Sequence, residues 1–182
     1  TSIMKNLLVL LCLLPSYCLG QIDTLESLAL DLLIFDKINS YRISKGVAPF
    51  EAFEDSLMRN FSYGLTRENS KKDRIAHSED FLDYSNAECI YSMRKSSYFD
   101  RTILAIDNKN FEQLAEGAVN GWINSSSHER CISSPFYHIA TVTSRITIDR
   151  KNREIYFVAS YHALSTLFDT RTGYTFNYEL KP

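Results

Sequence analysis

The hydrophobic period of the chain changes in its C-terminal third, and this change constrains the fold most strongly. Apolar residues recur every three or four positions over residues 25–44, 54–68 and 111–123, which predicts three amphipathic helices. Residues 139–148 and 154–163 are instead rich in Ile, Val, Thr, Tyr and Phe and flank a polar segment, which predicts an antiparallel hairpin. Helices first and strands last indicate an α+β fold with an antiparallel sheet, and not a βαβ series.

The spacing of the apolar residues also predicts which face of each helix is buried. In the first helix, the predicted inward residues are Leu28, Leu32, Phe35, Ile38 and Tyr41. In the second helix they are Leu57, Phe61, Gly64 and Leu65. Trp122 in the third helix is expected to pack that helix onto the sheet.

Length and composition fit one folded domain. The chain has 182 residues, which is long enough to bury a continuous core. Its 45% hydrophobic content excludes a disordered polar chain, and only 6 Gly and 4 Pro exclude a fibrous or linker-rich one. The formal net charge of −2 gives no basic excess, so we do not expect nucleic acid as a partner.

The N-terminus predicts export from the cytoplasm. Lys5 precedes an apolar run over residues 7–14, and small residues follow up to Gly20, which is the order of a secretory signal peptide. The run is about half of the ~20 residues that span a bilayer, so we expect no stable membrane span. A membrane anchor and lipidation at Cys18 are less favoured alternatives. The predicted location is extracellular, or periplasmic or in the cell envelope.

Three segments follow from these features. Residues 1–20 are the signal peptide, residues 21–165 the folded domain, and residues 166–182 a C-terminal extension. Within the extension, residues 174–180 have the composition of an extra strand.

Cleavage of the signal peptide leaves two cysteines, Cys89 and Cys131. Two cysteines in an oxidising compartment allow one intramolecular pairing, so a Cys89–Cys131 disulfide is predicted, with two buried free thiols as the alternative. Glu88 precedes Cys89, and His128 lies three residues before Cys131. The disulfide would therefore bring Glu88 and His128 close together.

Three polar residues are candidates for a site: His77, Glu88 and His128. Two imidazoles and a carboxylate can hold Zn²⁺ and leave one position open. A Glu–His pair can instead transfer protons during hydrolysis. The third interpretation is a buried polar network without chemistry. For His138 and His162, near the ends of the two hairpin strands, we expect surface or pairing roles.

Several motifs occur in the order seen in a known family. An N-x-x-R-x-x-x-G run is formed by Asn39, Arg42 and Gly46, and a W-x-x-S-x-x-H run by Trp122, Ser125 and His128. Between them lie His77 and Ala87-Glu88-Cys89-Ile90, which keeps the Glu and Ile of a G-E-N-I segment. Over about residues 28–163, the chain resembles the CAP superfamily (cysteine-rich secretory proteins, antigen 5, pathogenesis-related 1), in its short bacterial SCP-like extracellular form.

The resemblance implies a three-layer α-β-α sandwich with a central antiparallel sheet and a cleft lined by His77, Glu88 and His128. Many members have a second cleft Glu; here Glu116 lies in the preceding helix and Ser125 occupies the signature serine, so no residue is assigned to that position. Together with Trp122, these two residues are the expected support of the cleft. Residues 91–108 are a candidate lid.

The function predicted from the sequence is binding. We expect a secreted CAP-fold protein in which His77 and His128 bind a divalent metal, Zn²⁺ above others, and Glu88 orients an imidazole or binds a metal-bound water. The resemblance implies that the protein also binds a small or lipid-like ligand. A protein partner is a further possibility that the sequence does not decide. One alternative is a peptide or ester hydrolase, with Glu88 as general base and His128 or zinc polarising the carbonyl. The other is a cell-envelope interaction domain with a vestigial cleft.

Overall fold

The computed structural model describes residues 22–52, 56–72, 75–83, 85–95, 97–165, 167–169 and 174–176. The predicted signal peptide, residues 1–20, lies outside the described residues.

A central sheet contains the predicted hairpin. Its four main strands are antiparallel and lie in the order β1 (Ile22–Leu25), β4 (Ile139–Asp149), β5 (Glu154–Leu164) and β3 (Ala87–Lys95). The hairpin is confirmed, because β4 pairs with β5 along its whole length. Ile139 lies opposite Leu164 at one end, and Asp149 lies opposite Glu154 at the other. Strand β2 (Glu51–Ala52) pairs in parallel with the start of β4. The sequence did not predict β1 or β3, and β3 forms one edge of the sheet.

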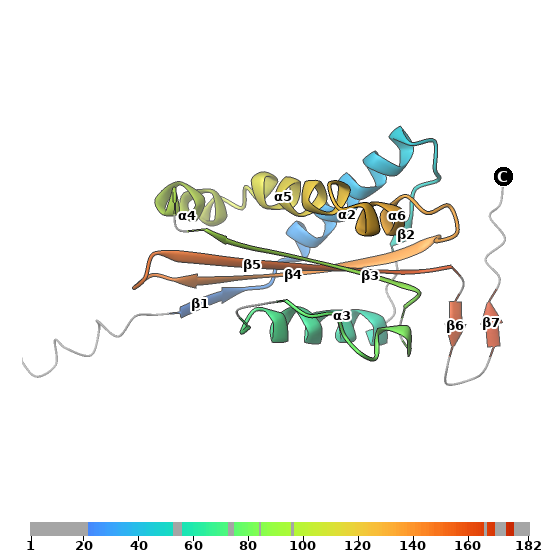
Figure 1. The fold of residues 1–182 in the computed structure, drawn as a ribbon. Coiled ribbons are helices and arrows are strands. Elements are labelled where there is room, and N and C mark those ends of the chain that lie inside the picture. The colour runs from blue at the N-terminus through green and yellow to red at the C-terminus, as the bar shows by residue number, and fades with distance from the viewer. Residues whose placement is uncertain are drawn as a thin grey trace, which may run out of the picture.

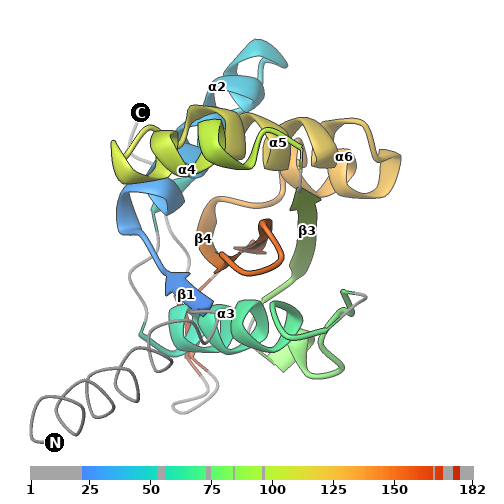
Figure 2. The same cartoon turned by 90° about the vertical axis from the view of Figure 1, so that its left-hand side faces the viewer.

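Helices cover both faces of this sheet (Figures 1 and 2). One face carries α3 (Ser56–Asn69), and the other carries α2 (Leu28–Ser44), α4 (Phe99–Asp107), α5 (Glu112–Ile123) and α6 (Ser126–Ile132). The predicted α+β class with a central sheet between helical layers is therefore confirmed. The three predicted helices correspond to α2, α3 and α5, whereas α4, α6 and the short 3-10 helix η2 (Phe81–Asp83) were not predicted.

The C-terminal extension forms its own small element. Strands β6 (Leu167–Asp169) and β7 (Tyr174–Phe176) pair with each other in a separate two-stranded sheet. The predicted extra strand thus exists over residues 174–176 but pairs with β6, and residues 177–180 lie outside the described residues.

The candidate lid has a different role from the one expected. Residues 87–95 form β3, which is hydrogen-bonded along its length to β5. Helix α4 follows the end of β3 that faces the β4–β5 turn, and its Phe99, Ile103 and Ile106 are buried in the main core. Glu88 lies at the opposite end of β3, about 23 Å away for seven residues of strand. Residues 91–108 therefore do not cover the candidate site.

The predicted face of α2 is wrong in part. Leu28 and Leu32 are 53% and 47% exposed, while Leu30 and Ile34 are buried. The reason is that two charged residues, Asp31 and Arg42, are also buried on this helix. A hydrophobic pattern treats charged residues as solvent-facing, so it places the buried face at the wrong angle.

Arg42 is a buried cation that ties α2 to distant loops. Its side chain is 1% exposed and lies flat over the Phe50 ring, with the guanidinium carbon 3.5 Å from the ring centroid. The guanidinium donates four hydrogen bonds of 2.7–3.0 Å to the backbone carbonyls of Ala48, Ile132, Ser134 and Tyr137. The Ile132 carbonyl belongs to the last residue of α6 and the Ser134 carbonyl lies two residues beyond it, so Arg42 fixes the end of that helix to α2.

The other residues of the same motif also have structural roles. The Asn39 side chain pairs with the backbone of Phe50, donating to its carbonyl at 3.0 Å and accepting from its amide at 2.7 Å. Gly46 follows α2 with φ of +73°, a conformation that glycine adopts without steric strain. The motif therefore ends α2 and holds the segment that leads into β2.

We expect Arg42→Lys to lower the free energy of unfolding by about 2–4 kcal/mol, because an ammonium group cannot satisfy four carbonyls arranged for a planar guanidinium. Chemical denaturation measures the change. The matched control is Arg150→Lys at an exposed ion pair with Asp23, where no measurable change is expected. Equal effects of the two substitutions would contradict the structural role of Arg42.

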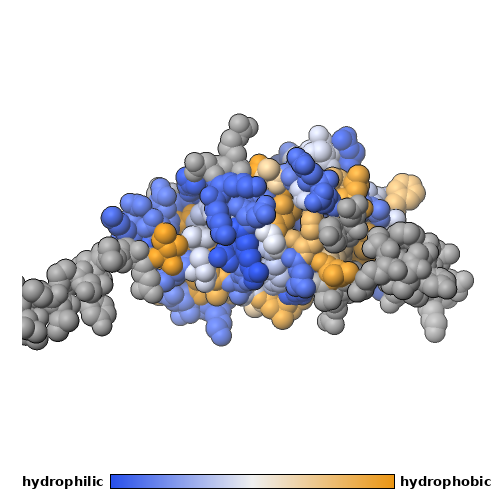
Figure 3. Space-filling model, turned by 90° about the horizontal axis from the view of Figure 1, so that it is seen from below, coloured by the Kyte–Doolittle hydropathy of each residue, from blue (hydrophilic) through white to orange (hydrophobic). Residues whose placement is uncertain are grey.

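The interface between α3 and the sheet is unusually polar. The buried side chains of α3 include Ser62, Thr66 and Asn69, whereas Leu57 and Gly64, predicted to face inward, are not buried. The sheet contributes the polar side chains of Thr143, Ser160 and His162 to this interface, and all three residues are 0% exposed. Apolar contact on this face includes a small cluster of Leu65, Ile90 and Val158. The outer surface on the α3 side is largely hydrophilic, with apolar residues in separate groups (Figure 3).

Asp31 joins α2, α3 and β4. Its carboxylate accepts hydrogen bonds from the Ser144 hydroxyl and, at 2.8 Å, from the Tyr63 hydroxyl. The guanidinium Nη2 of Arg59 lies 3.7 Å from Oδ2 of the same carboxylate. Burial raises the pKa of Asp31 to about 6, and the hydrogen bonds oppose this shift only in part.

This pKa predicts that Asp31 makes the fold less stable as the pH rises from about 4 to about 6. In this window the folded carboxyl keeps its proton while the unfolded one loses it, so stability falls by up to about 3 kcal/mol and is then constant. Denaturation at a series of pH values, comparing the wild type with Asp31→Asn, isolates this contribution. The same pH slope in both proteins would contradict it.

Candidate functional site

The alternation of side chains along β3 places Glu88 and Cys89 on opposite faces of the sheet. Ile90 packs against Leu65 of α3, so Glu88, two residues away, also faces the α3 layer. Tyr91 packs against Gly121 of α5, so Cys89 faces the α5 and α6 layer. The expectation that Glu88 and His128 would meet directly is therefore corrected, because Glu88 extends away from α6.

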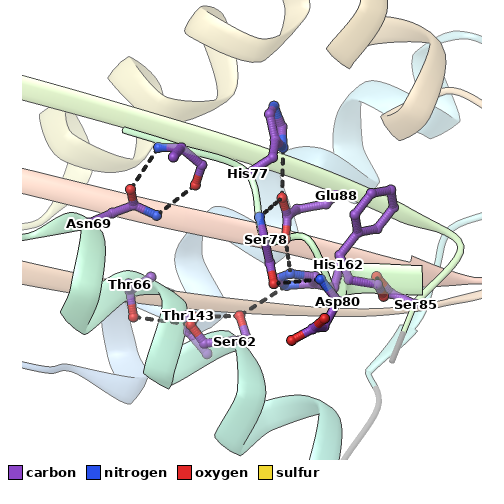
Figure 4. A network of polar contacts seen from close by, with 12 residues as sticks. Ser62, Thr66, Asn69, His77, Ser78, Asp80, Ser85, Glu88, Thr143 and His162 are labelled. Carbon is purple, nitrogen blue, oxygen red and sulfur yellow. Dashed lines mark hydrogen bonds and ion pairs between the residues drawn. The ribbon is translucent and has the colours of Figure 1, made fainter. Parts of the chain in front are cut away.

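Glu88 is the centre of a buried polar network (Figure 4). Its side chain is 1% exposed. One carboxylate oxygen accepts hydrogen bonds from His77 Nδ1 at 2.6 Å and from the Ser78 amide at 3.1 Å. The other accepts from His162 Nε2 at 3.1 Å. Burial by itself would raise the pKa of Glu88, but the hydrogen bonds from the two histidines and Ser78 outweigh it and lower that pKa.

The network continues from His162 into the α3 interface. His162 is fully buried and lies opposite Glu88 in the β3–β5 register. Its Nδ1 is 3.1 Å from the Ser62 hydroxyl, which is 2.6 Å from the Thr143 hydroxyl. Because Glu88 is an acceptor, neutral His162 carries its proton on Nε2, and its Nδ1 accepts from Ser62. The Thr143 hydroxyl then donates to the Ser62 hydroxyl, so donors and acceptors match along the whole series of hydrogen bonds.

His77 is the exposed end of the network, and its backbone is fixed on both sides. Before it, the Asn69 side chain donates to the Ala76 carbonyl at 3.1 Å and accepts from the Ala76 amide at 2.8 Å. After it, the Ser78 amide binds Glu88. The imidazole itself is 58% exposed. The loop is thus held rigidly while the ring stays open to solvent.

His77 also links the two faces of the sheet. Its ring centroid is 6.2 Å from that of His128 on α6, with the rings tilted by 45°. Since β3 is the edge strand, His77 reaches Glu88 on one face and His128 on the other around this edge. The structure therefore brings together all three candidate residues, with His77 in the middle.

The protonation of the two histidines follows from their surroundings. The Glu88 carboxylate accepts from His77 Nδ1, so the neutral ring carries its proton there and its Nε2 offers a lone pair. Burial, with a smaller effect of His77, lowers the pKa of His128. His128 is therefore neutral at pH 7 and can also act as a ligand.

Cys89 and Cys131 are free thiols that lie in contact. The Cys89 thiol donates to the His128 carbonyl at 3.9 Å, and the two thiols interact with each other. Burial raises the pKa of Cys89 well above its usual value. The hydrogen bond from Cys89, aided by Arg130 and His77, lowers the pKa of Cys131 to about 7 against the effect of burial. The predicted disulfide stays a prediction.

The expected support residues have diverse positions. Trp122 is buried, with its ring 6.1 Å from Tyr161 of β5, as predicted. Ser125 is the N-cap residue of α6, and its hydroxyl is 3.2 Å from that of Ser127. Glu116 is not at the site, because it lies 3.8 Å from Lys37 at the contact between α5 and α2.

His162 is the residue that sequence reasoning missed. Of the two roles expected for it, the surface role is wrong, since it is buried, and the pairing role is the one observed, since it binds Glu88. An apolar β-strand pattern gives a polar residue no reason to face inward, and β3 was not recognised as the partner of β5. Had the β3–β5 register been available, it would have identified the pair. His138 differs, as it is only partly buried and lies just before β4.

Two absences hold for the described residues. They contain no group of three or more His, Cys, Asp or Glu side chains that could hold a metal ion. None of the helices in the same part of the chain has the length and apolar character needed to cross a bilayer.

Comparison with known proteins gives one distant likeness to report. No protein-family model and no curated protein matches the chain. Among solved structures, the chain is similar to an outer surface protein from Borrelia burgdorferi, with 11% sequence identity and a TM-score of 0.40. The match covers 79% of this chain and 98% of that chain. So distant a likeness says nothing about function.

The network predicts the tautomer of His77. In the wild type at about pH 8, nitrogen NMR should show neutral His77 with its proton on Nδ1, the less common form in free histidine. In Glu88→Gln the loss of the negative charge should shift His77 toward the Nε2 tautomer. His138, outside the network, should not change. Wild-type His77 protonated on Nε2 would contradict the geometry of the site.

Proposed function

We propose that the protein binds a divalent transition metal, with Zn²⁺ as the leading candidate, between His77 and His128. Glu88 does not bind the metal in this proposal. It orients His77 from behind, because a carboxylate on the second nitrogen of a ligating imidazole fixes the tautomer and makes the free nitrogen more basic.

One observation carries this proposal: an exposed imidazole is held by a buried carboxylate and a pinned loop, 6.2 Å from a second imidazole. Fixing an exposed side chain in this way costs conformational entropy and buries a charge that needs three hydrogen bonds. The Ser78 amide and His162 already bind one carboxylate oxygen each, so His77 is an additional donor. The extension to His77 supports a role at the surface.

The spacing of the two rings fits the proposed metal. Around a tetrahedral zinc with Zn–N distances of about 2.0–2.1 Å, two imidazole centroids lie about 5 Å apart. The observed 6.2 Å needs only a small closure, which side-chain rotation can supply. Two protein ligands leave the other positions to water or to a bound molecule, so the site would be open. When bound, zinc would supply Lewis-acid polarisation of such a molecule.

The sequence supports the setting of this function. The predicted signal peptide places the protein outside the cytoplasm, in the extracellular space, periplasm or cell envelope. The order of His77, Glu88 and His128 within the CAP-like motifs supports membership of that superfamily, and with it a small or lipid-like ligand. This membership remains a proposal that rests on the motifs alone.

Hydrolysis is the weaker alternative. Glu88 was the expected general base, but its oxygens are buried and accept three hydrogen bonds. In a hydrolase at this site His77 would be the exposed base and Glu88 its positioning partner. The third candidate, an interaction domain, needs neither histidine.

The test is zinc binding by the mature protein, purified without chelator and followed by native mass spectrometry and calorimetry. We expect one zinc per chain in the wild type. His77→Ala and His128→Ala should abolish binding, and Glu88→Gln should weaken it ~10–100-fold. His138→Ala is the matched control and should bind as the wild type does.

Two outcomes would overturn the proposal. One is an apo mass that added zinc does not change, which would favour an interaction domain with a structural His–Glu network. The other is zinc binding that all four variants retain, which would place the metal elsewhere. Loss of turnover without loss of zinc in Glu88→Gln, on a peptide or ester substrate, would support the hydrolase instead.

A further inference from the structure

The two thiols on the α6 face of β3 form a second cluster with its own chemistry. Cys89 comes from the edge strand and Cys131 from α6, 42 positions later in the sequence. Cys131 packs against the core cluster that contains Cys89, the Cys89 thiol donates to a carbonyl of α6, and the two thiols interact. Bond formation between them would therefore need little movement of either element.

Access to the two sulfurs differs sharply. Cys89 is 0% exposed within the main core, so a reagent in solution cannot reach it without unfolding. Cys131 is partly exposed and packs against that core from outside it. The side chain of Arg130 adds a positive charge close to it. A disulfide that approaches from solution would thus react with Cys131 first, because Cys89 is buried beneath it.

The reduced pair is also well accommodated. The Cys89 thiol has an acceptor, the His128 carbonyl, at 3.9 Å. The surrounding core is closed, with neighbouring Tyr161 fully buried and its hydroxyl 3.5 Å from the Cys131 carbonyl. The fold therefore does not need a bond between the sulfurs to be complete. A pair that the fold accepts as thiols is suited to reversible exchange.

We propose that Cys131 and Cys89 are a reactive dithiol that exchanges with low-molecular-weight disulfides, Cys131 being the attacking residue and Cys89 the resolving one. The Cys131 thiolate attacks one sulfur of the disulfide, forms a mixed disulfide and releases the first thiolate. The Cys89 thiolate then attacks the sulfur of Cys131 and releases the second. Two protein thiols are oxidised, one external disulfide is reduced, and the two protons pass to the released thiolates.

The dithiol does not depend on the proposed metal site, although the two are neighbours. A disulfide would tie β3 to α6 beside His128, whose carbonyl faces Cys89. To keep the two proposals separate, the test uses chelator-treated protein. Its result then holds whether or not the histidines bind zinc.

The experiment treats the reduced mature protein with oxidised glutathione under native conditions and follows the masses over time. The wild type should lose two hydrogens, a fall of ~2 Da, and reduced glutathione should reverse this change. Cys89→Ser should accumulate the mixed disulfide at Cys131, because the resolving thiol is missing. Cys131→Ser should react at least ~10-fold more slowly, because its remaining thiol is buried.

Three results would overturn the proposal. One is equal reactivity of the two variants, and another is a mixed disulfide that persists in the wild type. The third is an internal disulfide that glutathione cannot reduce in the folded protein, which would make the bond purely structural. Near-ultraviolet circular dichroism checks that each variant is folded. Cys89→Ala replaces Cys89→Ser if a hydroxyl in the core disturbs packing.

Discussion

The buried guanidinium of Arg42 is the contact on which the α2–α6 half of the molecule depends. It has no carboxylate partner among the described residues, and four backbone carbonyls and the Phe50 ring replace the water it loses. One of those carbonyls belongs to Ile132, the last residue of α6, and another to Ser134 just beyond it; α6 is the helix that carries both His128 and Cys131. A charge that the hydrophobic pattern assigns to solvent thus helps to fix where the candidate residues of this layer lie.

On the α3 face of the sheet, Glu88 likewise holds together segments that are far apart in the sequence. It connects the fixed loop of His77, the strand β5 through His162, and α3 through Ser62. The two halves of the site meet at the edge of β3, where the exposed ring of His77 passes from one face to the other. The candidate metal site and the thiol pair are therefore both products of one edge strand, whose alternation sends Glu88 to one face and Cys89 to the other.

The sequence identified the members of the site better than their arrangement. His77, Glu88 and His128 were found through their spacing and chemistry, and Cys89 and Cys131 through the count of cysteines. Their contacts were not, because the expected order joined Glu88 to His128, and Glu116 was expected at the cleft although it lies beside Lys37. The hydrophobic pattern also could not predict the polar interface of α3. Ser62, Thr66 and His162 are buried there because they form hydrogen bonds, and not because they are hydrophobic.

By itself the sequence determined the class of fold, three of the helices and the β4–β5 hairpin, because these depend on local periodicity and turn composition. The apolar spacing also predicted the contact of Trp122 with the sheet. Only the tertiary structure decided that β3 is an edge strand paired with β5, that His162 lies against Glu88, and that His77 stands between Glu88 and His128. These relations join residues far apart in the chain, and pairing register and the burial of charge by hydrogen bonds leave no periodic trace in a sequence.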